Sequence, residues 1–117
     1  MRILVTGSRD WDDEEAIFTA FYPYFSEIKD HILVSGGCPN GADMMAEHLW
    51  LQYGGTLERH PADWKQFGKS AGFRRNAEMV ELGADICLAF IKNQSKGASM
   101  TAGLAFQNGI PVERYEK

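Results

Sequence analysis

Serine and glycine residues separate an apolar run from a helical pattern in the segment that contains Ser35-Gly36-Gly37 and Gly41-Ala42-Asp43. Glycine residues let the main chain approach a ligand closely and adopt positive φ angles. The first turn of the following helix offers unpaired N–H groups and the positive end of its dipole. The segment therefore predicts a phosphate-binding loop. Its spacing matches neither the dinucleotide-binding GxGxxG motif nor the P-loop motif, and a tight turn that packs the helix is the alternative interpretation.

Two other loops carry similar groups. Gly7-Ser8-Arg9 supplies a flexible main chain, a hydroxyl and a guanidinium, and Lys96-Gly97-Ala98-Ser99 supplies an ammonium and a hydroxyl at a helix start. A helix dipole contributes roughly 0.3–1 kcal/mol at an exposed site, and a charge-assisted hydrogen bond contributes about 1.5–3 kcal/mol. Micromolar binding requires about 8 kcal/mol, so we expect several converging loops, rather than one, to bind the ligand.

A pair of arginines, Arg74 and Arg75, precedes Asn76 at the expected start of another helix. Positive charge at this end of a helix opposes the dipole, which suggests a functional reason for it. Arg75 and Asn76 are the stronger candidates for contact with an anion, and surface salt bridges are the alternative. Trp64 is a candidate for stacking on a base, and packing in the core or within its loop is the alternative role.

Carboxylates in the same loops need a different explanation, because a carboxylate repels a phosphate. We expect Asp43 to cap its helix, to meet a ribose hydroxyl or to help hold a cation, and Asp63 to cap the turn that follows it. The histidines and the two cysteines, Cys38 and Cys87, have no metal-ligand spacing, so no metal is expected. Cys87 lies in an apolar run and is expected in the core, whereas Cys38 is expected to be an incidental loop residue, with a reactive or ligand-touching thiol as the alternative.

These loops need a scaffold that brings them together, and the chain alternates short apolar runs with longer helical patterns. Strands are expected at residues 2–6, 32–34, 56–59, 85–91 and 111–115. Helices are expected to follow a cap at Asp12 or Asp13, to start near Ala42, and to span residues 73–82 and 98–108. This alternation predicts a single α/β domain over residues 1–117, with a doubly wound parallel sheet of about five strands and helices on both faces. Right-handed crossovers favour the strand order 3-2-1-4-5.

Ligands of such sheets bind at the carboxyl ends of the strands, where the strand order reverses. In the expected order this crevice lies between the first and fourth strands. The loops that would border it lie at residues 7–10, 35–43, 60–72 and 92–99, and these segments are also rich in glycine and polar residues. The topology and the composition therefore predict the same site.

The composition restricts the partners. Hydrophobic residues make up 44% of the chain and charged residues 24%, with a net charge of -4. These values are typical of a globular protein, and the negative charge disfavours extended contact with nucleic acid. No apolar run reaches the ~20 residues that span a bilayer, and the first residues are too short in their apolar part for a signal peptide. A cytoplasmic protein without a membrane partner is expected.

The chain resembles the SLOG superfamily, and specifically its YspA-like branch related to YpsA, over nearly its whole length. The residues that carry this resemblance are Gly7-Ser8-Arg9, Ser35-Gly36-Gly37, Gly41-Ala42-Asp43, Ala46, Pro61-Ala62-Asp63-Trp64, Ala71-Gly72, Arg75-Asn76, Met79, Gly97 and Gly109-Ile110-Pro111-Val112. The resemblance implies a Rossmann-like fold and a nucleotide or nucleotide-derived ligand, of the NAD, ADP-ribose or nucleoside monophosphate type. Members of this branch are mostly known as predicted binders or sensors, and no further cofactor is expected. Relatives often pair through helices, and Trp50, Tyr53 and Phe106 are candidates for a homodimer face or for the core.

The superfamily also includes the Lonely Guy enzymes, which cleave the N-glycosidic bond of nucleoside monophosphates. Their Pro-Gly-Gly-x-Gly-Thr signature is replaced here by residues 93–101, in which Ala98 stands for the threonine and no acid stands where the glutamate would. This departure makes a binding module the first hypothesis and an N-glycosidase the second, with Asp10, Asp43 and Glu78 as candidate carboxylates. The related DNA-processing protein A suggests a third role, single-strand nucleic-acid binding, which the net negative charge disfavours.

Overall fold

The computed structural model describes residues 1–117, in which strands and helices alternate. The strands are β1 (Arg2–Gly7), β2 (Ile32–Ser35), β3 (Thr56–Arg59), β4 (Ile86–Ile91) and β5 (Val112–Glu116). The α-helices are α1 (Glu14–Phe21), α2 (Gly41–Gln52), α3 (Trp64–Phe67), α4 (Ala71–Leu82) and α5 (Lys96–Gln107). Two 3₁₀ segments, η1 (Tyr22–Asp30) and η2 (Gly68–Ser70), precede β2 and α4. The predicted alternation is confirmed.

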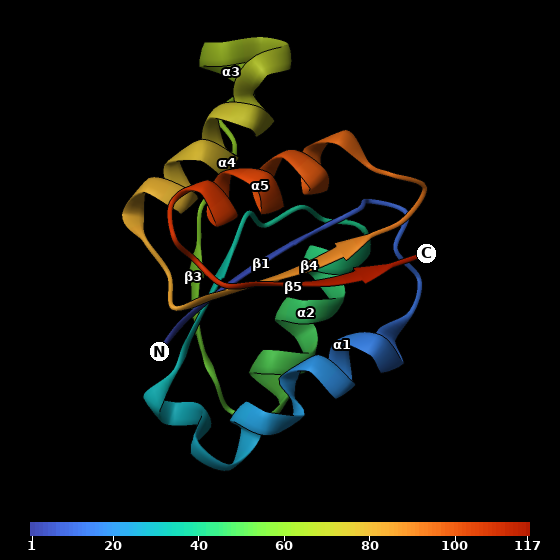
Figure 1. Cartoon of the computed structure of the whole chain (residues 1–117), viewed down its shortest axis with the longest axis vertical. Coiled ribbons are helices and arrows are strands. Elements are labelled where there is room, and N and C mark those ends of the chain that lie inside the picture. The colour runs from blue at the N-terminus through green and yellow to red at the C-terminus, as the bar shows by residue number, and fades with distance from the viewer.

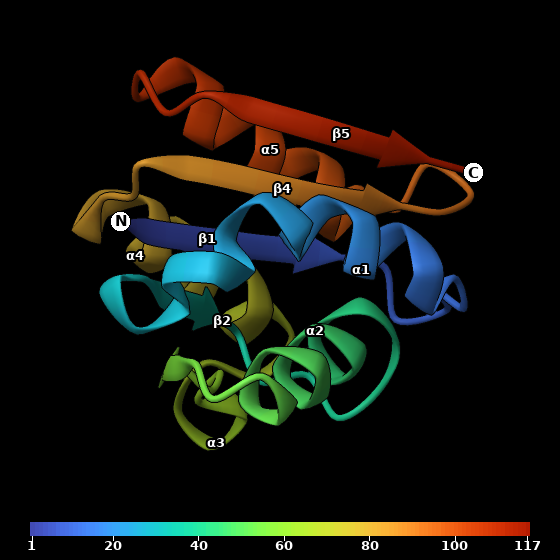
Figure 2. The same ribbon diagram turned by 90° about the horizontal axis from the view of Figure 1, so that it is seen from below.

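All five strands pair in parallel in the predicted order, β3-β2-β1-β4-β5. β1 lies at the centre, and its Leu4 stands opposite Val34 of β2 and Cys87 of β4. Helices α1 and α2 cover one face of the sheet, and α4 and α5 cover the other (Figure 1 and Figure 2). The chain therefore has the expected doubly wound, Rossmann-like α/β fold, and the strand order reverses between β1 and β4.

Burial on both faces of the sheet explains why the central strands are apolar. Successive residues of a strand point to opposite faces, so Ile3 and Val5 pack with Trp50 on the side of α1 and α2. Leu4 and Cys87 pack on the side of α4 and α5. Burial in this second cluster raises the pKa of the Cys87 thiol to about 12, as expected for a cysteine that acts as a small hydrophobic residue.

Local signals set the ends of α1. Asp13 is its cap, because its Oδ1 accepts a hydrogen bond from the N–H of Ala16 at 3.1 Å. Pro23 lies at the start of η1, and the chain continues there as 3₁₀ turns with non-helical backbone at Glu27 (φ −126°). The helical pattern that the sequence suggests therefore ends as tighter turns before β2.

Helix α4 begins at Ala71, which is earlier than the predicted start near Phe73, because α3 and η2 already fold residues 64–70 into helical turns. Asp63 caps α3, since its Oδ1 accepts from the N–H of Gln66 at 3.1 Å, and this confirms its predicted role. Arg75 consequently lies in the second turn of α4. The expectation that it opens the helix was wrong, and the helix dipole opposes it less than predicted.

The three candidates for a homodimer face lie in different surroundings. Trp50 is fully buried and belongs to the core, whereas Tyr53 and Phe106 are exposed. Tyr53 also stacks on the ring of Phe25, with ring centroids 4.1 Å apart. No helix of the structure has the length and apolar character needed to cross a bilayer.

Candidate functional site

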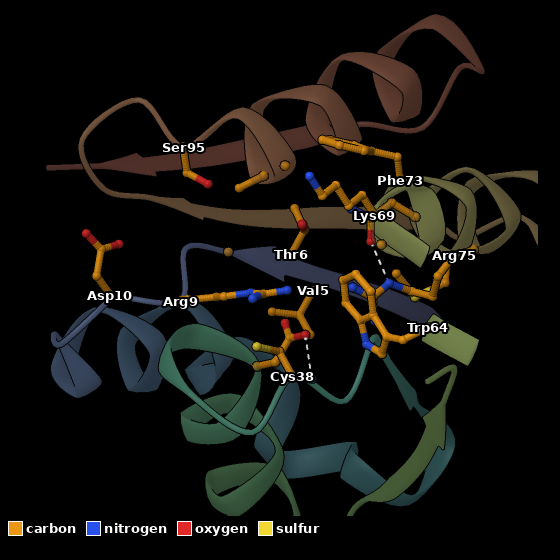
Figure 3. A pocket seen from close by; sticks show the side chains of 17 residues that line it. Val5, Thr6, Arg9, Asp10, Cys38, Trp64, Lys69, Phe73, Arg75 and Ser95 are labelled. Carbon is orange, nitrogen blue, oxygen red and sulfur yellow. Dashed lines mark hydrogen bonds between the residues drawn. The ribbon is translucent and has the colours of Figure 1, made fainter. Parts of the chain in front are cut away.

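A crevice of about 540 Å³ opens at the carboxyl end of β1, at the edge where the strand order reverses (Figure 3). This volume lies within the roughly 300–1,000 Å³ range of small-molecule sites. The crevice is lined by Val5, Thr6, Gly7, Arg9, Asp10, Cys38, Asp43, Trp64, Lys69, Gly72, Phe73, Arg75, Asn76, Met79, Ser95, Gly97 and Ala98. These residues come from β1, from α4 and from the segments that follow β1, β2, β3 and β4, so the structure places a crevice where the topology predicts a ligand site.

Part of the predicted set of site residues meets in this crevice. The predicted residues that line it are Gly7, Arg9, Asp10, Asp43, Trp64, Arg75, Asn76 and Gly97. The predicted residues outside its lining are Ser8, Ser35, Gly36, Gly37, Gly41, Ala42, Glu78, Lys96 and Ser99. The loops therefore converge as expected, but several of their residues face the protein and not the crevice.

The two predicted serines hold the loops in shape. Ser8 Oγ accepts from the N–H of Lys92 at 2.8 Å and donates to its carbonyl at 3.3 Å, which joins the loop after β1 to the end of β4. Ser35 Oγ donates to the buried carboxylate of Glu47 at 2.7 Å and accepts from the N–H of Gly37 at 3.1 Å. Both hydroxyls are thus engaged within the protein.

Gly41 allows the start of α2 to pack directly on the loop after β1. It has a φ of 70°, and a Cβ atom there would lie 2.3 Å from the carbonyl oxygen of Ser8. That carbonyl accepts from the N–H of Ala42 at 3.2 Å. One of the N–H groups that the sequence suggests for a phosphate is therefore occupied by the protein itself.

Arg75 connects three walls of the crevice. Its guanidinium donates to the carbonyls of Gly36 and, at 3.4 Å, His60, and to the side-chain Oδ1 of Asn76 at 2.7 Å. Burial lowers the pKa of Arg75, the nearby carboxyl of Asp43 opposes this effect, and the charge of Arg9 adds to it. The Arg75 side chain takes part in none of the ion pairs of the chain. A partly buried positive charge therefore faces the crevice without an ion pair, near the carboxyl of Asp43.

Asp43 is the buried acid of the crevice, with 7% of its surface exposed. Its Oδ2 accepts from the N–H of Cys38 at 3.2 Å, while Oδ1 has no hydrogen-bond partner in the protein and is not sealed from solvent. Burial raises the pKa of Asp43 to about 6, against the opposing effects of this hydrogen bond and of the charges of Arg75 and Arg9. The residue at the cap position of α2 is Asn40, so Asp43 stabilises the preceding loop and leaves one oxygen toward the crevice.

Charged and aromatic side chains surround the rest of the opening. Arg9 is exposed and forms no ion pair, and its guanidinium carbon lies 5.7 Å from the centre of the Trp64 ring. Figure 3 shows Lys69 and Phe73 on the opposite side of the crevice from Arg9. The crevice thus contains three cationic and two acidic side chains, although the whole chain is negative.

The crevice lining includes Lys69, Phe73 and Ser95, which were not predicted as site residues. Lys69 lies within the loop at residues 60–72 that was expected at the ligand edge, and it is the second lysine after Trp64. This local excess of positive charge is the signal that could have identified it. Phe73 carried no such signal, because an aromatic residue at a helix start is equally typical of packing.

Comparison with known proteins identifies a family for this chain. The model of a family described as YspA, cpYpsA-related SLOG family matches residues 1–67, which include the loops after β1 and β2. The chain is 39% identical over 119 residues to the Gene 61 protein of Mycobacterium phage D29, and the match covers 97% of this chain and 95% of the phage protein. No solved structure matches the chain.

Proposed function

Because the chain belongs to the YspA, cpYpsA-related SLOG family, we propose that its crevice binds a nucleotide or nucleotide-derived phosphate ligand and that the protein acts as a binding module or sensor. The ligand class is that of NAD, ADP-ribose or a nucleoside monophosphate. The observation that carries the proposal is the meeting of Arg9 and Arg75, neither of which forms an ion pair, in a crevice at the reversal of strand order.

Electrostatics supports an anionic ligand. A buried charge without a partner is costly, whereas a hydrogen-bonded partner of opposite charge offsets that cost. Arg75 is held in place by carbonyl oxygens, so it does not need to reorganise when a phosphate arrives. The exposed ammonium of Lys69 adds a third cation. Three cationic side chains from separate segments therefore face one ligand site, as we expect for micromolar binding of an anion.

The rest of the crevice lining suits the base and the ribose of a nucleotide. Trp64 and Phe73 present exposed rings to the crevice. Aromatic side chains stack on bases of any sequence, because every base has a π face. The oxygen of Asp43 that has no protein partner suits a ribose hydroxyl.

The test compares Arg9→Ala with a matched control, Arg114→Ala. Both arginines are exposed, and neither side chain makes a hydrogen bond or an ion pair within the protein, but only Arg9 lines the crevice. Calorimetric titration with AMP, NAD, ADP-ribose and ribose 5-phosphate should show saturable binding to the wild type. Loss of a charge-assisted hydrogen bond should weaken binding roughly 10- to 100-fold in the Arg9 variant only. Absence of binding, or equal affinity in both variants, would overturn the proposal.

The buried carboxyl of Asp43 favours one alternative, cleavage of the N-glycosidic bond of the bound nucleotide. In this reaction a water oxygen bonds to the anomeric carbon, the bond to the base breaks, and the base leaves with a proton. A carboxyl with a pKa near 6 suits an acid–base role. Asp10 lies at the rim, where it accepts from the Asn93 side chain at 3.2 Å, and Glu78 lies outside the lining.

Chromatography of the ligand after incubation separates the two functions. Release of free base and ribose 5-phosphate by the wild type, but not by Asp43→Asn with binding retained, would identify an enzyme. Recovery of intact ligand after prolonged incubation would leave the binding module as the function.

A further inference from the structure

A second, smaller hollow of about 360 Å³ adjoins the crevice. The two hollows share Arg9, Cys38, Trp64 and Arg75 as lining residues. Figure 3 shows Arg9, Trp64 and Arg75 approaching one another from different elements. The two hollows therefore meet at Arg9 and Arg75, and we call this shared boundary the ridge.

We propose that this two-part crevice holds a nucleoside diphosphate sugar, with the base in the larger hollow, the pyrophosphate across Arg9 and Arg75, and the second sugar in the smaller hollow. The proposal rests on the function proposed above and specifies the class of ligand.

The position of the cations determines how the phosphate must be linked. A terminal phosphate ends a molecule, so a ligand with a terminal phosphate on the ridge would fill one hollow and leave the other empty. A phosphate on the ridge with groups on both sides must be esterified on both sides. Two guanidinium groups match the two negative charges of a pyrophosphate bridge better than the single charge of a phosphodiester.

The two hollows differ in the groups that they offer. The larger one has the exposed aromatic ring of Phe73 in addition to the shared Trp64, which suits a planar base. The smaller one is lined by the glycine loop after β2, by Asn40 and by Pro61 and Ala62. Main-chain groups and an amide suit the hydroxyls of a sugar, and the smaller hollow adds no second aromatic ring for another base.

The test uses matched pairs of ligands, because the base is not known: AMP with ADP-ribose, UMP with UDP-glucose and GMP with GDP-mannose. The nucleoside diphosphates alone control for the second phosphate. In at least one set, the diphosphate sugar is expected to bind the wild type about tenfold or more tightly than both the monophosphate and the diphosphate, because the sugar adds hydrogen bonds.

Substitutions that fill one hollow locate the two halves of the ligand. Ala62→Trp fills the smaller hollow, and Asn40→Trp is a second variant for the same purpose, since the Asn40 side chain makes no capping hydrogen bond. Both variants should remove the gain from the sugar while monophosphate binding stays as in the wild type. Gly97→Trp, at a position where a side chain meets no neighbour, fills the larger hollow and should weaken all the ligands.

The outcomes separate this inference from the proposed function. A monophosphate that binds through Arg9, with no gain from the sugar or with a gain that survives both substitutions at the smaller hollow, would overturn the two-part ligand and leave nucleotide binding intact. If no nucleotide of any set binds, the proposed function fails and this inference fails with it.

Discussion

The guanidinium of Arg75 occupies the space that a side chain on Gly36 would need, because a Cβ atom at position 36 would lie 2.5 Å from Arg75 Nη1. The same guanidinium donates a hydrogen bond to the carbonyl of Gly36, from a position 39 residues away in the chain. Arg75 therefore joins α4 to the glycine loop after β2 and fixes the distance between two walls of the crevice.

Substitution Gly36→Ala should displace the Arg75 guanidinium and break this hydrogen bond. We expect the free energy of unfolding to fall by about 1–3 kcal/mol and nucleotide binding to weaken, as measured by urea unfolding and calorimetry. In an Arg75→Ala background the same substitution has room, so its cost should largely disappear in a double-mutant cycle. An equal cost in both backgrounds would show that Arg75 is not the cause.

Asp43 should make stability depend on pH in a known direction. Burial raises the pKa of Asp43 from 3.8 to about 6, so the folded protein holds this proton more tightly than the unfolded chain does. The stabilisation is complete below pH 4 and is lost as the pH rises to 6, and it amounts to roughly 3 kcal/mol. Asp43→Asn has no such titration, so its stability relative to the wild type should rise across this range and stay constant above it. A constant difference from pH 3.5 to pH 7 would contradict the raised pKa.

Ser35 should be important for stability although it lies outside the crevice. Ser35→Ala removes a donor from the buried carboxylate of Glu47 and an acceptor from the N–H of Gly37. Arg59 still pairs with Glu47, so we expect a loss of about 1–3 kcal/mol and not unfolding. Ser26→Ala, at an exposed position in η1, is the control and should leave the urea midpoint unchanged. Equal midpoints for the two variants would show that the Ser35 hydrogen bonds contribute nothing.

The sheet and the edge that carries the crevice could be predicted because few topologies fit the pattern. Alternating strands and helices with right-handed crossovers leave a small number of strand orders, and the strand at Thr56–Arg59 has the predicted bounds. Once the sheet is parallel, the loops after its strands must meet at one edge. Arg9, Asp43 and Arg75 came together for that reason.

The direction of individual side chains could not be predicted, because it depends on helix starts and on packing. Helix α5 begins at Lys96, earlier than the predicted start at Ala98, and residues one position apart point about 100° apart around a helix. Gly97 and Ala98 line the crevice, whereas Lys96 does not. A glycine such as Gly41 likewise allows close approach of the main chain, but the sequence does not say whether a ligand or the protein itself makes that approach.

Two glycines should respond in opposite ways to alanine. Gly41 has a positive φ, and a Cβ there would meet the main-chain oxygens of Ser8 and Arg9 at 2.3 and 2.5 Å. Gly41→Ala is therefore expected to cost at least roughly 2 kcal/mol. Gly103 lies inside α5 with nothing near its Cβ position, so Gly103→Ala should stabilise the protein by about 0.5–1 kcal/mol. Thermal unfolding checks both, and a stabilised Gly41 variant would contradict the packing of α2 on the loop after β1.

Trp64 should report ligand binding through its fluorescence. The other two tryptophans, Trp11 and Trp50, are buried at 2% and 0% exposure, whereas Trp64 is 50% exposed and lines both hollows. A base that stacks on Trp64 should change its emission, and Trp64→Ala should weaken binding by about 1–3 kcal/mol. Trp64→Phe retains a ring, so calorimetry should still detect binding while the fluorescence change disappears. Phe106→Ala, which removes an exposed ring outside both hollows, should alter neither measurement. A fluorescence change that persists in Trp64→Phe would mean that the ligand binds elsewhere or acts on a buried tryptophan.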